Sequence, residues 1–358
     1  MPEADTKKVT IHSIAENLGV SAGTVSYVLS GQGRKRNVAK KTIAKVNAAA
    51  KKLNYSPNFW ARSLAQSRTG IVSVMFSDLK GDWAHRAMAG ILKVFRPKNY
   101  IPVISLYERS FLTEDVEGIG TSEVDLMLQR RDEGLICQPI PPARDEYVRL
   151  ASNGMKLVLI GSQLEDMAGL ENVSSVTWDC GLAVKALVQH LIRSGRKRIA
   201  FFGSRHGVNS DITRFEAYKE TLEEAGLEVR DEWVKWGLGY KFAEEASLEL
   251  KSLLVDNREK PDAIFAINDA VALGIMQLLS GLNIKTPDDI ALTGMGNLYL
   301  GGFPLVGLTT VKEPIERMGH ASAEMMIELF DNPQKGPIHR KIECNELIIR
   351  KTTGGDTL

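Results

Sequence analysis

Basic side chains gather in the first 70 residues of the 358-residue chain, where they could neutralise phosphate groups. This segment holds twelve Lys and Arg and three acidic residues, a net charge of +9. The other 288 residues carry 33 basic and 41 acidic side chains, so the overall charge of +1 hides a strong asymmetry. A basic segment on an acidic body is the electrostatic pattern of a protein that binds nucleic acid. A solvated basic helix bundle without a partner is the alternative.

Apolar residues recur at helical spacing in this basic segment. Residues 11–18 place four apolar side chains on one helical face, and Gly19 interrupts the pattern. Ser21 is a suitable N-cap for a second helix with Val25, Val28 and Leu29 on its apolar face. Two helices joined by a short turn that contains Gly predict a helix-turn-helix. A third helix is expected from about Val38, with lysines on its outer face.

The second helix carries the side chains that could read DNA. In a helix-turn-helix, the N-terminal residues of this helix contact base edges in the major groove. Ser26 and Tyr27 can form hydrogen bonds there, whereas Ala22 and Gly23 allow close approach. A helical hairpin that packs on another domain is the alternative interpretation, and the basic outer face argues against it.

A short helix is predicted after the three-helix segment. Asn54–Asn58 is rich in turn formers, and Phe59–Ala65 could then form one or two helical turns. So short a helix is marginal in water by itself, but it could form against DNA. Leu64 could then enter a minor-groove base step and kink the duplex. A linker whose apolar residues pack against the body is the alternative.

From residue 70 onward, short apolar runs alternate with helical patterns, which predicts open parallel sheets. The expected strands are Gly70–Phe76, Ile101–Leu106, Gly134–Cys137, Leu157–Ile160, Arg198–Gly203, Ala263–Ile267 and Ile290–Gly294. The expected helices lie near 84–96, 122–132, 180–194, 211–225, 241–255 and 269–281. These are too many strands for one comfortable sheet, so two lobes are expected, divided near residue 172. Ligands of such sheets bind beyond the carboxyl ends of the strands, here in the cleft between the lobes.

Other function classes find little support. The polar start contains no signal peptide, no apolar run is long enough to span a membrane, and three scattered cysteines (Cys137, Cys180 and Cys344) suit a reducing cytoplasm. A transport solute-binding protein is therefore disfavoured. Gly294–Gly296 and Gly118–Gly120 do not complete a phosphate-binding fingerprint, and neither HExxH nor GxSxG occurs. We therefore expect no catalytic residue, metal or cofactor.

Many motifs resemble those of the lactose-repressor family, in the family's order and over nearly the whole chain. In the head these are 9–15, 19–21, 24–26 and 28–31, followed by Asn54–Asn58 and Ala61–Leu64, which resembles the hinge helix. In the body they are 190–192, 195–201, 265–274, 287–291, 308–311, 314–319 and 346–350. The resemblance implies an α/β protein with a helix-turn-helix head, a hinge helix and a two-lobed core like the periplasmic binding proteins.

The resemblance also implies a function and a domain plan. Members bind operator DNA as dimers, usually as repressors, under control of a small effector. Here the head would span 1–57, the hinge 58–69 and the core 70–358. Lobe 1 would comprise about 70–171 and 313–345, and lobe 2 about 172–312 and 346–358. The partners expected are operator DNA, a sugar-like effector and a second copy of the chain.

The site residues follow from the motifs and the family positions. The DNA-binding set is Thr10, Ser21, Ala22, Gly23, Thr24, Ser26, Tyr27, Ser30, Tyr55, Asn58, Ala61 and Leu64. The effector-binding set is Trp83, Asp179, Arg214, Asn268, Asp269 and Asn297. Arg214 stands at the family's effector-binding arginine, and its neighbours in sequence offer no other partner. A guanidinium can hold adjacent hydroxyls or a carboxylate through two parallel bonds. Asp179 and Asp269 could instead cap the helices that follow them.

Three departures from the family pattern put the ligand specificity in doubt. Tyr27 stands where the recognition helix usually has Arg, and Lys80–Trp83 replaces the frequent Asn-Pro-Phe-Phe. Gly296-Asn297 replaces an acidic pair that commonly contacts the effector. The chain ends without apolar heptads, so a dimer is expected and not a tetramer.

Overall fold

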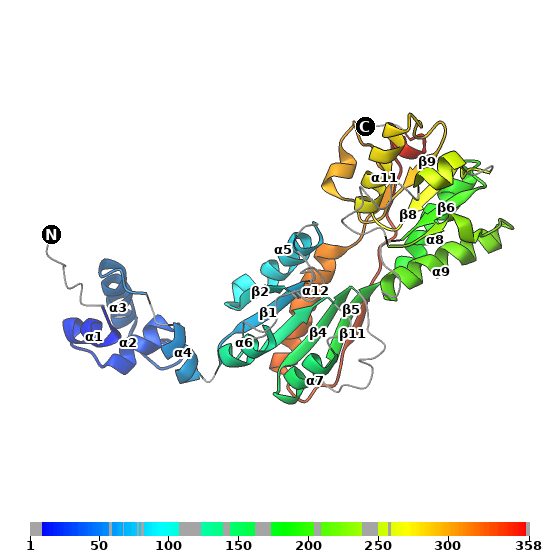
Figure 1. Cartoon of the computed structure of the whole chain (residues 1–358). Helices are drawn as coiled ribbons and strands as arrows, with labels where there is room; N and C mark the ends of the chain where they lie inside the picture. Colours follow the sequence, from blue (N-terminus) through cyan, green and yellow to red (C-terminus); the bar gives the residue numbers. More distant parts are fainter. Residues whose placement is uncertain are drawn as a thin grey trace, which may run out of the picture. The chain divides into compact units, whose positions relative to one another are not determined.

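The structure, a computed structural model, divides into two compact units, Met1–Thr69 and Gly70–Leu358. The residues that it describes are 9–56, 59–66, 68–76, 79, 82–106, 123–138, 144–161, 173–203, 209–237, 250–256 and 259–355. Each unit is shown in Figure 1 with its elements labelled.

The first unit is helical. Its elements are α1 (Ile11–Leu18), α2 (Ala22–Leu29), α3 (Lys40–Lys52) and α4 (Phe59–Gln66). Ile14, Val25 and Val46, one from each of the first three helices, are fully buried and form the centre of a small core. Gly19 ends α1 in a left-handed conformation, with φ 65°, that a residue without a side chain adopts at little cost. The two predicted helices and their turn are therefore present.

The second unit begins with a six-stranded parallel sheet that forms the first lobe. The strand order is β11-β5-β4-β3-β1-β2. The strands are β1 (Ile71–Phe76), β2 (Ile101–Leu106), β3 (Gly134–Cys137), β4 (Lys156–Gly161), β5 (Val173–Trp178) and β11 (His339–Ile342). Because β5 pairs with β4 and β11, the first connection to the second lobe follows Trp178. The sequence division near residue 172 placed this strand in the wrong lobe.

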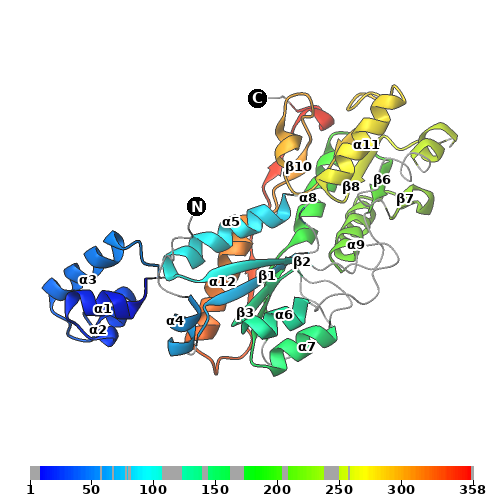
Figure 2. The same ribbon diagram turned by 60° about the vertical axis from the view of Figure 1, so that its left-hand side comes forward.

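Helices cover both faces of this sheet (Figure 2). On one face lie α5 (Trp83–Phe95) and α12 (Ile315–Asp331), and on the other α6 (Glu123–Arg130) and α7 (Arg144–Ser152). Alternate residues of β1 point to opposite faces: Val74 packs in the core beneath α5, and Met75 packs in the core beneath α6 and α7. Neither α7 nor α12 was among the helices predicted from periodicity.

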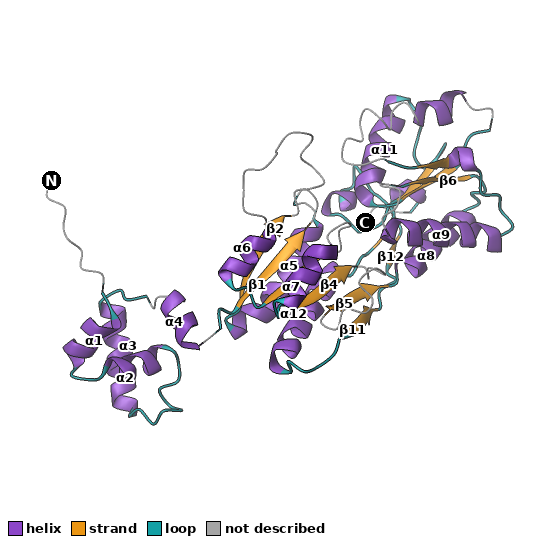
Figure 3. Cartoon of the chain, turned by 60° about the horizontal axis from the view of Figure 1, so that its bottom comes forward, coloured by secondary structure: helices purple, strands orange, loops and turns teal. Residues whose placement is uncertain are grey.

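The second lobe contains a four-stranded parallel sheet of order β7-β6-β8-β9. Its strands are β6 (Ile199–Phe202), β7 (Val234–Lys235), β8 (Ala263–Ala266) and β9 (Ala291–Thr293), and its long helices are α8 (Cys180–Arg193), α9 (Asn209–Glu224) and α11 (Asp269–Gly281). Figure 3 shows the strands of both lobes in orange between helices. Only part of the predicted helix 241–255 lies in the described residues, where a π-helical turn spans Ser252–Asp256.

The chain passes back into the first lobe after β10 (Thr310–Val311) and returns with β12 (Leu347–Ile348). These two short strands pair antiparallel, so the second and third connections lie side by side. Their positions agree with the connections expected near residues 312 and 345.

Two glycines bring the backbones of α5 and α12 into contact. A Cβ added to Gly90 would lie 2.0 Å from the carbonyl oxygen of Glu316, and one added to Gly319 would lie 2.2 Å from that of Ala87. Both distances are far shorter than any allowed contact between a Cβ and a backbone atom. Backbone atoms in a packed helix can move apart only at a high energetic cost. The crossing of these helices therefore requires glycine at both positions.

We expect Gly90→Ala to lower the free energy of unfolding by about 3 kcal/mol, because the new methyl group forces the two helices apart. Urea denaturation followed by circular dichroism measures the change. Gly281→Ala, at the end of α11 in open space, is the matched control and should leave stability unchanged or slightly increased. Equal stability of the two variants would contradict the close crossing.

Candidate functional site

In the head, some of the predicted DNA contacts are used to begin helices. Thr10 and Ser13 form a reciprocal capping box at the start of α1. The hydroxyl of Ser21 accepts from the backbone N–H of Thr24 at 3.1 Å and lies 2.9 Å from the Thr24 hydroxyl. Each cap satisfies backbone donors that a helix start leaves unpaired. Thr10 and Ser21 nevertheless remain exposed at the first turns of their helices.

The outer face of α2 is polar and accessible. Gly23, Ser26 and Tyr27 are exposed, whereas Ala22, Thr24 and Ser30 are half-buried. The guanidinium of Arg36 lies 5.1 Å from the ring centroid of Tyr27, a cation–π distance. The Ser30 hydroxyl donates to the carbonyl of Tyr27 at 3.2 Å. Tyr27 is therefore held at the surface beside a basic side chain.

The basic residues of this unit form its exposed rim. Exposed side chains are Arg34, Lys35, Arg36, Lys40, Lys41, Lys45, Lys51 and Lys52. No acidic side chain forms an ion pair with them among the described contacts of this unit. Their charges are thus available to a polyanion.

The predicted hinge helix is present as α4. Ser63 is buried, and its hydroxyl donates to the carbonyl of Phe59 at 2.9 Å. Leu64 is 74% exposed and Trp60 is 56% exposed, an unusual exposure for large apolar side chains on a short helix. Tyr55 is half-buried against the head core. Asn58 and the side chain of Ala61 lie outside the described residues.

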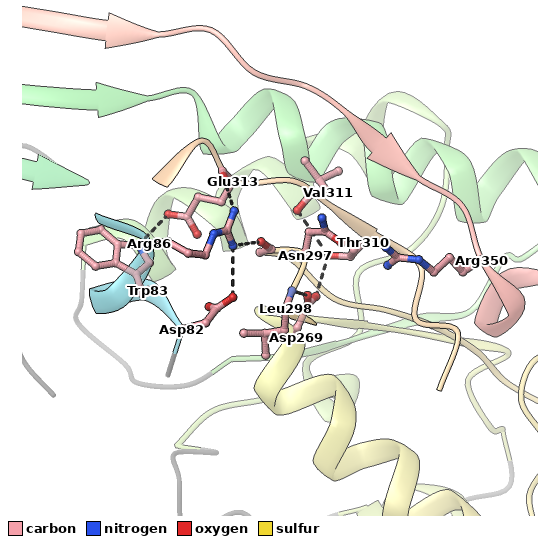
Figure 4. A network of polar contacts seen from close by, with 11 residues as sticks. Asp82, Trp83, Arg86, Asp269, Asn297, Leu298, Thr310, Val311, Glu313 and Arg350 are labelled. Atoms are coloured by element: carbon pink, nitrogen blue, oxygen red, sulfur yellow. Dashed lines mark hydrogen bonds and ion pairs between the residues drawn. The ribbon is translucent and has the colours of Figure 1, made fainter. Parts of the chain in front are cut away.

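In the body, most of the predicted effector residues lie around the connection between the two lobes. Figure 4 shows this network. Trp83, at the start of α5, donates from Nε1 to Oε1 of Glu313 at 3.2 Å, and its ring packs edge-on against Phe76. Glu313 lies in the second connection, just before α12, and is buried. Trp83 therefore joins the first lobe to this connection.

Asp269 has a structural role in the second lobe. Its carboxylate is fully buried and accepts from the backbone N–H of Leu298 at 2.6 Å and from the hydroxyl of Thr310 at 2.7 Å. Burial raises its pKa to about 6, although both hydrogen bonds act in the opposite direction. Asp269 does not cap α11: the side chain of Asn268 does so, by accepting from Val271 N–H at 2.9 Å. The carboxylate instead fixes the segment that follows β9.

Asn297 lies in that segment, with a left-handed φ of 56°. Its Oδ1 accepts from Nη2 of Arg350 at 2.9 Å, and Nη1 of Arg350 donates to the carbonyl of Leu308 at 2.7 Å. Asp179 is also engaged. It caps α8 through Leu182 N–H at 3.0 Å and pairs with Lys341 at 2.6 Å, and this pairing lowers its pKa. The capping alternative for Asp179 is thus observed.

Arg214 has protein partners that the sequence did not indicate. Its Nη1 donates to the carbonyl of Ile267 at 3.1 Å, next to Asn268, and Cys180 and Glu313 lie close enough to interact with it. Burial lowers the pKa of the guanidinium, but the negative charge of Glu313 and the other neighbours more than offsets this, so its pKa is raised. Its Nε is buried without a hydrogen-bond partner in the described part of the chain. An unpaired buried donor is costly and is therefore available to a ligand acceptor.

The sequence missed Arg86, Glu313 and Arg350, which hold the predicted residues in place. Arg86 lies one helical turn after Trp83, so helical spacing could have identified it. Glu313 lies between the family-like motifs 308–311 and 314–319, and its charge at an expected lobe connection was the available signal. Arg350 gave no local signal, because its partner Asn297 lies 53 positions away in the sequence.

Two other kinds of feature, a membrane-spanning helix and a metal-binding cluster, were considered from the sequence and can be compared with the described residues. In the described residues, no helix is both long and apolar enough to cross a bilayer. The same part of the chain contains no cluster of three or more His, Cys, Asp or Glu side chains that could bind a metal ion.

Comparison with known proteins places these features in a family. Residues 10–58 match the model of bacterial regulatory proteins of the lacI family, and residues 188–353 match that of a periplasmic binding protein-like domain. The chain is 28% identical over 346 residues to the HTH-type transcriptional repressor PurR of Haemophilus influenzae, covering 96% of this chain and 98% of that protein. It is 26% identical to the ribose operon repressor of Escherichia coli, covering 90% and 94%.

A solved structure supports the fold. The lac repressor dimer bound to operator and the anti-inducer ONPF aligns with a TM-score of 0.76 at 22% identity, covering 97% of this chain and 99% of that chain. The chain therefore has the head domain of the lacI family of bacterial regulatory proteins, at residues 10–58, and a periplasmic binding protein-like domain, at residues 188–353. Its predicted fold class, a helix-turn-helix head on a periplasmic-binding-protein-like core, is confirmed.

The buried carboxylate of Asp269 predicts a specific pH dependence of stability. Its folded pKa of about 6 lies above the ordinary value of 3.8, so its stabilising contribution is complete below pH 3.8 and is lost as the pH rises through 6. A shift of about two units corresponds to a loss of about 3 kcal/mol. We expect the unfolding free energy of the wild type, relative to Asp269→Asn, to fall by about this amount from pH 3.8 to pH 7. Parallel pH profiles of the two proteins would contradict the assignment.

Proposed function

We propose that this chain is a DNA-binding transcriptional repressor that acts as a homodimer in the cytoplasm. A small polar effector, a sugar or sugar derivative, bound between the two lobes of the body would control its affinity for operator DNA. The observation that carries the proposal is the head: an exposed polar face on α2, lined by Gly23, Ser26 and Tyr27, within a unit whose exposed charge is strongly basic. The lacI-family head domain at residues 10–58 supports it.

The division of labour within the head follows from its chemistry. The exposed lysines and arginines attract the phosphate backbone and give affinity without sequence information. The hydroxyls of Ser26 and Tyr27 can contact base edges and give specificity. Leu64, exposed on α4, would enter a minor-groove step, which rationalises why a large apolar side chain is left uncovered.

A second copy of the chain is needed for a stable operator complex, because one helix-turn-helix offers a limited surface. Large apolar side chains exposed on the segment after β9 support a homodimer. They are Tyr299, Leu300, Phe303 and Leu305, with exposures of 79%, 55%, 43% and 90%. The rings of Tyr299 and Phe303 are in edge-to-face contact, 5.1 Å between centroids. An exposed apolar patch of this kind is typical of a protein interface.

The effector proposal rests on Arg214. Its buried Nε has no hydrogen-bond partner among the residues that the structure describes, and Glu313 supplies a carboxylate in the same region. A ligand with adjacent acceptors and donors would satisfy both. Vicinal hydroxyls of a sugar have this chemistry. Similarity to the ribose operon repressor is consistent with a sugar.

We expect the full chain to bind a roughly palindromic DNA duplex with two chains per duplex, measured by fluorescence anisotropy. The operator duplex for this assay is first identified by selecting the duplexes that the full chain binds from a mixed pool. Each neutralised phosphate should contribute about 0.9 to the slope of log affinity against log salt concentration. Removal of residues 1–69, which form a separate compact unit, should abolish binding. Salt-independent affinity, or full binding by the truncated body, would refute the proposal.

Two variants separate affinity from specificity in the same assay. Leu64→Ala should weaken operator binding and remove the kink, seen by electrophoretic bending assays, whereas Leu182→Ala, an exposed leucine on α8 outside the head, should not. Tyr27→Phe retains the ring against Arg36 but loses the hydroxyl, and should change the preferred base at one position by about 1 kcal/mol. Equal losses on all sequences for both head variants would contradict the division of labour.

The effector site is tested by thermal shift against sugars, sugar phosphates and nucleobases. A ligand at 100 times its Kd stabilises the protein by about 2.7 kcal/mol, which is readily measured. Arg214→Ala and Arg214→Lys should lose this ligand-dependent stabilisation. Arg196→Lys is the matched control, because Arg196 donates to the backbone carbonyls of Asp262 and Pro287 within the second lobe. Unchanged ligand stabilisation in the Arg214 variants would place the effector elsewhere.

A further inference from the structure

One side chain, Arg86, joins the first turn of α5 to the opposite lobe (Figure 4). Its Nη1 donates to the carbonyl oxygen of Gly296 at 2.8 Å, in the segment after β9 of the second lobe. Its Nη2 donates to the carbonyl oxygen of Glu313 at 2.9 Å, in the connection between the lobes. We propose that Arg86 is an interlobe latch, which holds the two lobes of the body together in the effector-free protein and breaks when they separate.

The guanidinium group suits this role because its donors are fixed in one plane. Two nitrogen atoms reach two acceptors on different segments, which a single ammonium group could not do with the same geometry. Asp82, four residues earlier, lies 3.5 Å from Nη1, and both side chains are only 19% exposed. Partial burial reduces the competition from water, so these charge-assisted hydrogen bonds are stronger than ordinary surface contacts.

Both ends of the latch are held rigidly by their own lobes. On one side, the glycine crossing with α12 prevents α5 from shifting along its axis. On the other, Gly296 has a φ of 128°, and its N–H donates to the carbonyl of Val311 at 2.9 Å. Since neither end can follow the other, relative movement of the lobes must break the Arg86–Gly296 bond. The contact therefore has two states, made and broken, as a switch requires.

The latch is connected to the proposed effector region through Glu313. Its carbonyl accepts from Arg86, its carboxylate accepts from Trp83, and its charge acts on Arg214. A ligand that engages Arg214 or the Glu313 carboxylate would act directly on the connection that Arg86 holds. This goes beyond the proposed function, because the latch is a property of the body and does not depend on whether the chain binds DNA.

The test measures the distance between the lobes in the full chain without DNA. Spin labels are placed at Asp145→Cys on α7 and Glu223→Cys on α9, both exposed, in a background with Cys180→Ser and Cys344→Ser. Cys137 is buried and can remain. Pulsed electron–electron double resonance then gives the distribution of distances between the label on the first lobe and the label on the second. We expect one narrow distribution for this background and a second, displaced population in Arg86→Met.

The ratio of separated to joined molecules should rise about tenfold in Arg86→Met, as expected for the loss of hydrogen bonds to a charged group. Lys93→Met is the matched control: Lys93 lies on the same helix but pairs with Glu316 within the first lobe, so its distribution should not change. Arg86→Gln, which retains an amide donor, serves if the Met variant does not fold, and should show a smaller shift. Identical distributions for Arg86→Met or Arg86→Gln and the parent, or an equal change in Lys93→Met, would overturn the proposal.

Discussion

The arrangement of the body depends on the contact between the backbones of α5 and α12. Gly90 and Gly319 allow these helices to approach until no Cβ fits between them. The crossing fixes the first turn of α5, which carries Trp83 and Arg86, relative to the first turn of α12, which follows Glu313. Arg86 contacts the second lobe at Gly296, and Trp83 contacts Glu313 in the connection between the lobes. The geometry of the interlobe region therefore follows from a packing constraint inside the first lobe.

A second constraint acts from the other lobe. The buried Asp269 carboxylate holds Leu298 and Thr310 together, and these residues border the segment that presents Gly296 to Arg86. Burying this charge costs free energy, and the hydrogen bonds from two donors offset part of that cost. A charge placed in this way fixes a loop more tightly than an apolar contact could, since hydrogen bonds have direction.

The sequence predicted features that depend on local chemistry. The cap at Ser21, the break in the helical pattern at Gly19 and most strands of the body follow from short-range rules and apolar runs. The charge asymmetry indicated a separate head. Fold class was also predictable, because alternating strands and helices admit few arrangements.

What the sequence could not predict depends on distant pairing. β5 belongs to the first sheet because it pairs with β4 and with β11, and β11 lies more than 160 residues further along the chain. Arg86 and Gly296 are 210 positions apart, and no periodicity reveals such a contact. Asp269 was correctly placed at a strand end, but its role as an acceptor inside the lobe depends on Thr310, a further 41 positions away.

Most of the polar residues predicted to bind the effector already form hydrogen bonds within the protein, which limits how an effector could bind. Asp179, Asn268, Asp269 and Asn297 each accept a hydrogen bond that maintains a helix start or a loop. A ligand that took these acceptors would have to replace bonds that the fold already uses, with little net gain. The buried Nε of Arg214 would carry no such cost, because it has no hydrogen-bond partner in the described part of the chain. A ligand recognised by Arg214 and its charged neighbour Glu313, as proposed above, would therefore gain more free energy and would reach the lobe connection directly.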